Sequence, residues 1–189
     1  MIDMNLTRRS ALEIAVAGGL VAMAGSAGGA GPPSAAAAND WAFLVGRWKV
    51  RHRKLRERLT GSNDWIEFDG SSENWPLLGG GANVEDNIFY TPDETYRGVA
   101  LRAFDPATNS WSIWWLDSRA TDRLDVPVRG TFENGVGTFL AEDSWKGTPV
   151  TVRFRWSDIT PQSAKWEQAF STDGGATWEV NWVMQFTRA

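Results

Sequence analysis

His52 is the residue of this chain best suited to proton transfer. It is the single histidine in 189 residues, and an imidazole exchanges its proton close to neutral pH. The residues around it alternate as they do in a β-strand, with Trp48 and Val50 in phase with His52 and three cations, Lys49, Arg51 and Arg53, out of phase. Two hypotheses follow. His52 is a polar anchor or general base in a binding site, or it is structural, either hydrogen-bonded in the core or turned to solvent by a bulge.

Arg102 is a candidate for binding an anion. It shares a strand face with Gly98, Ala100 and Phe104. If this face is internal, the guanidinium requires a carboxylate partner or an anionic ligand, and the small residues would leave room for that ligand. The candidate carboxylate partners are Glu142, Asp117 and Glu73. A structural ion pair and an anion anchor are equal alternatives.

Most catalytic and metal-binding patterns are missing from the sequence. No G-x-S-x-G elbow, phosphate loop, dinucleotide fingerprint or H-E-x-x-H motif occurs. The chain has no cysteine, which excludes disulfides, thiolate metal sites, iron–sulfur clusters and a cysteine nucleophile. A single histidine also excludes a histidine-rich metal site within one chain. We therefore expect no metal and no cofactor, and the sequence assigns no enzyme class.

Charge and length limit the kind of protein further. Nineteen Lys and Arg against 23 Asp and Glu give a net charge of −4, which disfavours a nucleic-acid-binding protein. After a leader of 38 residues, about 150 residues remain, enough for one domain with a sizeable core.

Residues 1–38 have the pattern of a twin-arginine export signal. Arg8 and Arg9 precede an apolar run over residues 12–24, which is shorter than the roughly 20 residues that span a bilayer. Residues 36–38 offer an A-x-A cleavage site. We expect the twin-arginine translocase to export the protein to the periplasm or beyond, with no membrane-spanning segment in the mature form. A short helix with a flexible linker is the alternative.

Residues 39–189 are predicted to form an all-β domain of about ten short strands. Turn residues interrupt the chain at regular intervals, and Asn134-Gly135 is a strong type I′ hairpin signal. Such spacing favours an antiparallel up-and-down barrel, because closure removes exposed sheet edges. A helical turn over Asp40–Val45, with Asp40 as its N-cap, is expected before the first strand. The strands are expected at residues 47–59, 65–75, 82–90, 95–104, 110–117, 128–132, 136–145, 150–156, 164–170 and 177–187.

Twelve tryptophans dominate the apolar faces of these strands. Strict alternation gives each late strand one apolar wall and one polar wall. The apolar wall holds Val150, Val152, Phe154, Trp156, Trp178, Val180, Trp182, Met184 and Phe186, and the polar wall holds Thr151, Arg153, Arg155, Glu179, Asn181, Gln185 and Thr187. Trp111, Trp114 and Trp115 cannot all face one way. Core packing is the commoner use of tryptophan, and stacking on a planar or sugar ligand is the alternative.

Three stretches of the chain resemble the calycin barrels. Gly46-x-Trp48 at the first strand, with Arg188 at the last, is similar to the pattern shared by lipocalins and related proteins. The stretches 96–118 and 170–188 look like a bacterial calycin-like family of unknown function. The resemblance implies a barrel of about ten strands with an internal apolar cavity, in which Trp48 plugs the closed end beneath Arg188. It also implies that His52 points inward.

Residues 171–178 match the Asp-box pattern of sialidase propellers. The pattern occurs once, in a chain too short for a propeller. We interpret it as a structural hairpin whose Ser171 and Asp173 bind the turn, in preference to a glycan-hydrolysing site.

The functional hypothesis is an exported barrel that binds a small apolar or aromatic ligand, anionic or neutral, in its cavity. The residues expected to line that cavity are His52, Arg102, Trp115, Trp166, Gln168 and Trp182. One alternative is a cofactor-free enzyme that uses the same cavity for acid–base chemistry. Another is an envelope interaction module with a filled core. Haem ligation by His52, known in a related barrel, is a remote further alternative.

Overall fold

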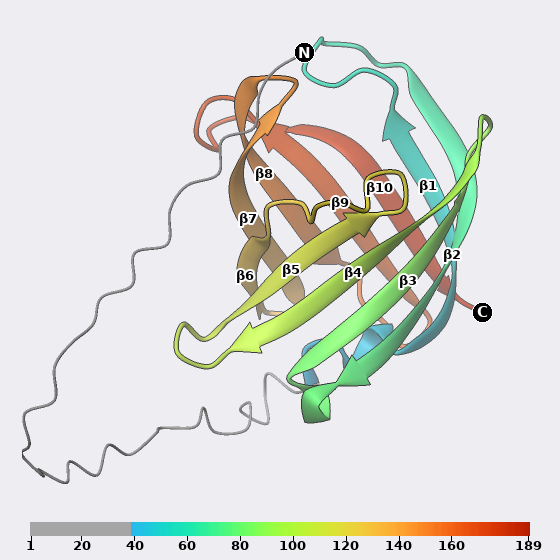
Figure 1. Ribbon diagram of the computed structural model, residues 1–189, viewed down its shortest axis with the longest axis vertical. Helices are drawn as coiled ribbons and strands as arrows, with labels where there is room; N and C mark the ends of the chain where they lie inside the picture. Colours follow the sequence, from blue (N-terminus) through green and yellow to red (C-terminus); the bar gives the residue numbers. More distant parts are fainter. Residues whose placement is uncertain (1–38) are drawn as a thin grey trace, which may run out of the picture.

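Ten antiparallel strands close into an up-and-down barrel in the computed structural model, which describes residues 39–189 (Figure 1). Arg8, Arg9 and the expected export signal lie outside the described residues. Each strand pairs with its neighbours in sequence, and β1 pairs with β10 to close the sheet. The strands are β1 (Gly46–Leu55), β2 (Trp65–Leu77), β3 (Ala82–Tyr90), β4 (Thr95–Asp105), β5 (Ser110–Asp117), β6 (Val128–Glu133), β7 (Val136–Trp145), β8 (Thr148–Ser157), β9 (Ser163–Ser171) and β10 (Glu179–Arg188). This confirms the predicted fold class and is consistent with a calycin-like barrel.

The turns follow the chemistry of their residues. Asn134 and Gly135 separate β6 from β7, and both have positive φ angles, 50° and 77°, as a type I′ turn requires. The first strand is shorter than predicted and ends at Leu55 rather than Leu59. Leu59 has a φ of 61°, and its N–H donates to the Glu179 carboxylate at the start of β10. That contact folds the β1–β2 loop back across the end of the barrel.

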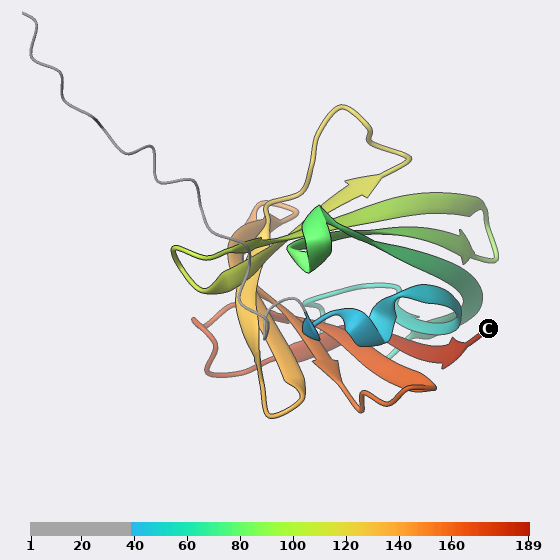
Figure 2. The ribbon, with the colours of Figure 1, turned by 90° about the horizontal axis from the view of Figure 1, so that it is seen from below.

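The other end of the barrel, the closed end, is covered by residues 39–45 (Figure 2). A single 3-10 turn, η2 (Ala42–Leu44), lies there, close to a second one, η3 (Leu78–Gly80). The predicted N-cap is wrong, since Trp41 precedes the turn and no side chain caps it. The Asp40 carboxylate instead accepts a hydrogen bond of 2.9 Å from Trp111 Nε1, which ties the segment to β5.

Aromatic packing fills the closed end. Trp41 is 4 % exposed and contacts rings from four strands, with centroid distances of 4.9–6.0 Å. Its partners are Trp111, Phe132, Phe139 and Trp156. These interlocking rings form a solid plug, so any space inside the barrel must lie toward the opposite, open end.

Gly46 and Trp48 have distinct structural roles at this end. Gly46 has a φ of 99°, a conformation that strains any residue with a Cβ. Trp48 is 1 % exposed and donates from Nε1 to the carbonyl oxygen of Leu44 at 2.7 Å. The predicted stacking of Arg188 on Trp48 is present, with the guanidinium carbon 3.7 Å from the ring centroid.

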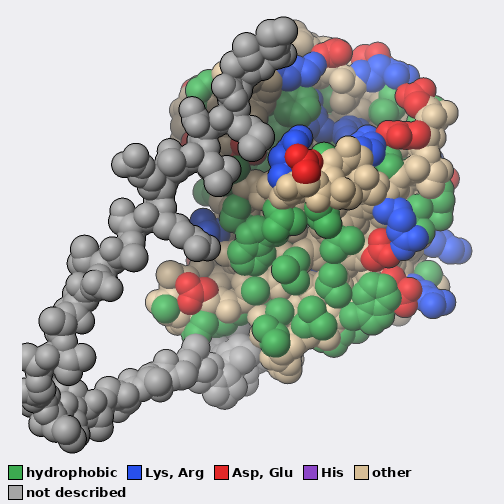
Figure 3. Space-filling view, in the orientation of Figure 1, with side chains coloured by type: hydrophobic (Ala, Val, Ile, Leu, Met, Phe, Trp, Pro, Cys, Tyr) green, Lys and Arg blue, Asp and Glu red, His purple; other side chains and the backbone are tan. Residues whose placement is uncertain are grey.

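The outer wall carries an unusual apolar row across β2 to β5. Cross-strand pairing places four side chains side by side, Trp75, Val84, Leu101 and Trp114. Trp75 and Leu101 are 43 % and 39 % exposed, and apolar side chains gather over this wall (Figure 3). Trp114 therefore faces outward, while Trp111 and Trp115 face inward, in line with the expectation that the three could not share a face.

The Asp-box residues make the hairpin bonds expected of a structural motif. Ser171 Oγ accepts from the N–H of Gly175 at 2.8 Å, and Asp173 accepts from both the N–H and the hydroxyl of Thr177, at 2.9 and 2.6 Å. These bonds stabilise the hairpin itself.

Candidate functional site

A cavity of about 530 Å³ occupies the barrel between the aromatic plug and the open end. This volume lies within the range of pockets that hold small molecules. Apolar lining comes from inward-facing residues of β4 to β10, including Ala100, Ile113, Val150, Val152, Phe154, Phe170 and Met184. Indoles add broad flat surfaces, contributed by Trp115, Trp145, Trp156, Trp166 and Trp182. The surface is hollowed at the open end, where basic side chains surround the hollow (Figure 3).

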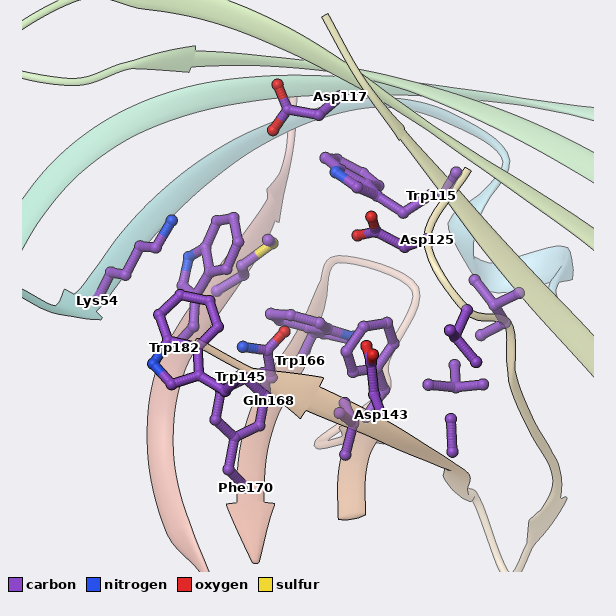
Figure 4. Close-up of a pocket in the computed structure, with 18 of the residues that line it drawn as sticks. Lys54, Trp115, Asp117, Asp125, Asp143, Trp145, Trp166, Gln168, Phe170 and Trp182 are labelled. Carbon is purple, nitrogen blue, oxygen red and sulfur yellow. The ribbon is translucent and has the colours of Figure 1, made fainter. Parts of the chain in front are cut away.

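The structure brings five of the six expected residues to this cavity. Trp115, Trp166, Gln168 and Trp182 line its wall (Figure 4). Arg102 also borders the cavity, beside Trp41 of the aromatic plug. Trp166 and Trp182 meet edge to face, with ring centroids 5.6 Å apart. An aromatic ligand could therefore lie against several indoles at once.

His52 is the sixth, and it does not line the cavity. It points inward as parity requires and is 1 % exposed, but Trp182 lies against it and donates from Nε1 to its Nδ1 at 3.3 Å. The imidazole stacks on Phe68 at a centroid distance of 4.7 Å. Gly70 is close on the other side, since a Cβ there would come within 2.5 Å of Nε2.

Burial also removes the proton chemistry expected of His52. Loss of hydration lowers its pKa to about 3, and the charge of Lys54 lowers it further. The imidazole is thus a neutral hydrogen-bond acceptor that fixes Trp182. This geometry fits neither a general base nor a haem ligand. The prediction that His52 lines the cavity is therefore wrong.

Arg102 forms a buried ion pair rather than an open anion site. Its guanidinium binds the Glu85 carboxylate, and both side chains are less than 5 % exposed. It also donates to Asn83 Oδ1 at 3.0 Å and lies 4.5 Å from the centre of the Trp41 ring. Its charge is therefore neutralised beside the aromatic plug.

The three carboxylates expected to pair with Arg102 lie elsewhere. Glu73 pairs with Arg47 on the outer wall, Asp117 with Arg119 at the open end, and Glu142 accepts from Thr151. The actual partner, Glu85, belongs to β3. Alternation along β3 could have predicted that Glu85 faces inward, because Asn83, Glu85 and Asn87 share the inner face with Phe89. The alternation is hard to recognise in the sequence because polar residues occur on both faces of β3.

The space beside Gly98 is filled by the side chain of Trp115 and is not open to a ligand. A Cβ at this position would lie 2.1 Å from the Trp115 ring, so the glycine lets that indole lie flat against β4. Ala100, two residues on, does line the cavity. Of the two small residues expected to leave room for a ligand, only Ala100 therefore borders the space inside the barrel.

Asn181 lies on the opposite strand face from the one predicted. The register of β10 against β9 shifts between Val180 and Trp182, so Asn181 turns inward and is fully buried. It accepts a hydrogen bond of 2.8 Å from Gln168 Nε2. A bulge of this kind breaks strict alternation, and it fixes the Gln168 side chain at the cavity wall.

Two cations at the open end were not expected from the sequence. Lys54 Nζ lies 4.0 Å from the centre of the Trp182 ring, and Arg58 lies 4.6 Å from that of Trp145. Within residues 39–189, neither side chain has a carboxylate oxygen within 4 Å. Burial lowers the pKa of Lys54 to about 7 and that of Arg58 to about 10, with the charge of Arg58 lowering the pKa of Lys54 further. Strand alternation could have predicted that Lys54 faces the interior, because it is in phase with Trp48 and His52.

Carboxylates line another part of the open end. Asp125 and Asp143 project into the cavity on the side away from Lys54 (Figure 4). Partial burial raises the pKa of Asp125, and the negative charges of Asp143 and Asp117 add to this effect. Asp117 is paired with Arg119 at 2.7 Å, and hydrogen bonds from Arg119 lower its pKa. A bound ligand would therefore meet a cationic side and an acidic side.

The described chain offers no evident metal centre. Within residues 39–189, no three His, Asp or Glu side chains are grouped so that they could hold a metal ion. No helix in the same residues is long and apolar enough to span a bilayer.

No family model matches the chain, and no curated protein matches it. The functional conclusion therefore depends on the geometry of the cavity.

Proposed function

We propose that this protein is an exported barrel that binds a small apolar or aromatic molecule in its internal cavity. The single observation that carries the proposal is the cavity of about 530 Å³, walled by indoles and aliphatic side chains. A well-packed core contains few voids larger than a water molecule. Space of this size beside flat aromatic surfaces is the usual form of a small-molecule site.

An acidic group on the ligand is favoured by the cations at the open end. Lys54 and Arg58 both line the cavity and lack a bonded carboxylate among the described residues. Partly buried charges of this kind are stabilised when an anion reaches them. The ligand would then place its apolar body against Trp166 and Trp182, with its acid group toward Lys54.

The alternatives have less support. A filled barrel that serves only as an interaction module is disfavoured by the cavity itself. An acid–base enzyme centred on His52 is disfavoured because the imidazole is buried behind Trp182 and away from the cavity.

Tryptophan fluorescence tests the proposal directly. Fatty acids, aromatic acids and terpenoids should be titrated into the mature protein, with the corresponding neutral amides as controls for charge. Saturable quenching is expected for at least one class, because several indoles line the cavity. If no compound quenches and none is detected by calorimetry, the binding proposal fails.

Export is a separate part of the proposal and rests on the sequence pattern of residues 1–38. A reporter fused to this segment should cross the inner membrane, and replacing Arg8 and Arg9 together by lysine should abolish transport. Unchanged transport of the double variant would contradict a twin-arginine signal. N-terminal sequencing of the exported protein should find a start near Asn39.

A further inference from the structure

Lys54 differs from the other lysines of the chain by its position. The sequence has four lysines. Lys146 and Lys165 are in ion pairs with Glu57 and Glu167, and Lys49 is on the outer face of β1. Lys54 is half-buried at the cavity wall. Lys146 also borders the cavity, but it is exposed and paired with Glu57, so within residues 39–189 Lys54 is the partly buried lysine without a bonded carboxylate that a molecule inside the barrel would meet.

The surroundings of Lys54 bring the pKa of its amine near neutral pH. The Trp182 ring lies 4.0 Å from Nζ, a contact that by itself favours the charged amine, and β1 and β10 hold the two residues side by side. Burial is the main cause that lowers the pKa of Lys54 to about 7; the charges of Arg58 and Arg119 lower it further, and that of Asp117 opposes them. A large part of the population therefore carries a neutral, nucleophilic amine at physiological pH.

We propose that Lys54 captures a carbonyl ligand as an imine, and that apolar or aromatic aldehydes are therefore among the molecules the cavity takes. This inference rests on the proposed function, because the ring or chain of the aldehyde must occupy the same cavity. Trp182 would lie against it beside Lys54, and Trp166, which meets Trp182 edge to face, would extend the same wall.

The reaction uses only the aldehyde and the lysine. The Nζ lone pair forms a bond to the carbonyl carbon, the C=O π pair moves to oxygen, and a proton from nitrogen neutralises that oxygen. The resulting carbinolamine loses its hydroxyl as water after protonation, while the remaining N–H proton is released, and the C=N bond forms. One aldehyde and one amine thus give one imine and one water, with no change in oxidation state.

Carboxylic acids near the open end can serve the proton transfers. Asp125 lines the cavity and has a raised pKa, so it exchanges its proton more readily near neutral pH than an exposed aspartate. It lies on the side of the cavity away from Lys54 (Figure 4), and water can relay the proton across the space between them. Asp125 is a positioning and proton-relay group here, while Lys54 forms the covalent bond.

Borohydride trapping tests the inference on the intact mature protein. Cinnamaldehyde is added at neutral pH, the imine is reduced, and the product is analysed by intact mass and peptide mapping. The expected result is one adduct per chain, whose mass gain equals the aldehyde less one oxygen atom, located on Lys54. Lys54→Arg should lose this adduct, since guanidinium forms no stable imine, whereas Lys49→Arg, the same change on the outer face of the same strand, should keep it.

Cinnamic acid and cinnamyl alcohol separate the two proposals. If the acid or alcohol quenches fluorescence saturably but trapping labels all four lysines equally, the cavity binds ligands and the imine proposal is wrong. If trapping is specific for Lys54 and is suppressed by the acid, both proposals stand. If none of the three compounds binds or reacts selectively, both fall.

Discussion

The guanidinium of Arg188 lies flat over the indole of Trp48, 3.7 Å from its centre. Arg188 also donates to the carbonyl oxygens of Val45 and Phe43, at 2.7 and 2.8 Å. One side chain from the last strand thus binds the first strand and the segment that precedes it. The contact closes the barrel end and sets the floor beneath the cavity.

Removal of the Trp48 indole should destabilise the whole barrel. Trp48→Ala is expected to lower the free energy of unfolding by about 3–5 kcal/mol, because a large buried ring leaves a void. Trp75→Ala, on the exposed outer wall, should cost about 0.5 kcal/mol. Urea denaturation followed by circular dichroism measures both. Equal losses for the two variants would show that Trp48 does not close the barrel.

His52 should make the protein less stable in acid. The folded state keeps the imidazole neutral down to about pH 3, whereas the unfolded chain binds a proton below about pH 6.5. Stability therefore falls with decreasing pH between these values, by up to about 1.4 kcal/mol per pH unit.

The variant His52→Gln tests this linkage while keeping a hydrogen-bond acceptor for Trp182. Its loss of stability between pH 7 and pH 5 should be smaller than that of the wild type by about 2 kcal/mol. Urea denaturation at the two pH values provides the comparison. Identical losses for the two proteins would mean that His52 is charged or exposed in the folded state.

The Arg102–Glu85 pair should behave as a structural unit. Glu85→Gln leaves a buried guanidinium uncompensated and should cost about 3–5 kcal/mol. Adding Arg102→Met removes the charge that has lost its partner, so the double variant should be more stable than Glu85→Gln alone. Thermal unfolding of the four proteins of this double-mutant cycle tests the coupling. Additive losses would contradict this coupling and would favour the alternative in which Arg102 binds an anionic ligand.

Lys54 should make the binding of acids depend on pH. Arg58 and Arg119 stay charged and Asp117 stays ionised through this range, so among these groups only Lys54 changes, losing its charge above about pH 7. Affinity for a carboxylic acid should therefore fall by about tenfold between pH 6 and pH 9, which is roughly the strength of one charge-assisted hydrogen bond. Fluorescence titration of Lys54→Met should show no such step, and Lys49→Met should retain it.

Much of the barrel was predictable because its signals are local. Turn pairs such as Asn134-Gly135 mark where strands end. The alternation of apolar and polar residues along β8 indicates which side chains face the core. Gly46, Trp48 and Arg188 then indicate how the ends of the chain meet. The bounds of β3, β5 and β7 agree with the predictions to the residue.

The remaining features depend on contacts between distant strands. The Arg102–Glu85 pair depends on how β3 and β4 register, and polar residues on both faces of β3 conceal it. The inward turn of Asn181 depends on a bulge that alternation does not reveal. The sequence shows that His52 faces inward but does not show which side chains pack against it. In the structure Trp182 lies between His52 and the cavity.

The most direct test of ligand binding is to fill the cavity and measure affinity. Ala141 lines the cavity from β7, and its neighbour Leu140 points outward and is 44 % exposed. Equilibrium titration with the tightest compound of the panel should show at least a tenfold loss of affinity for Ala141→Trp, because the new indole occupies the ligand's space. Leu140→Trp should bind as the wild type does. Equal affinity in all three proteins, with Ala141→Trp folded by circular dichroism, would contradict binding inside the barrel.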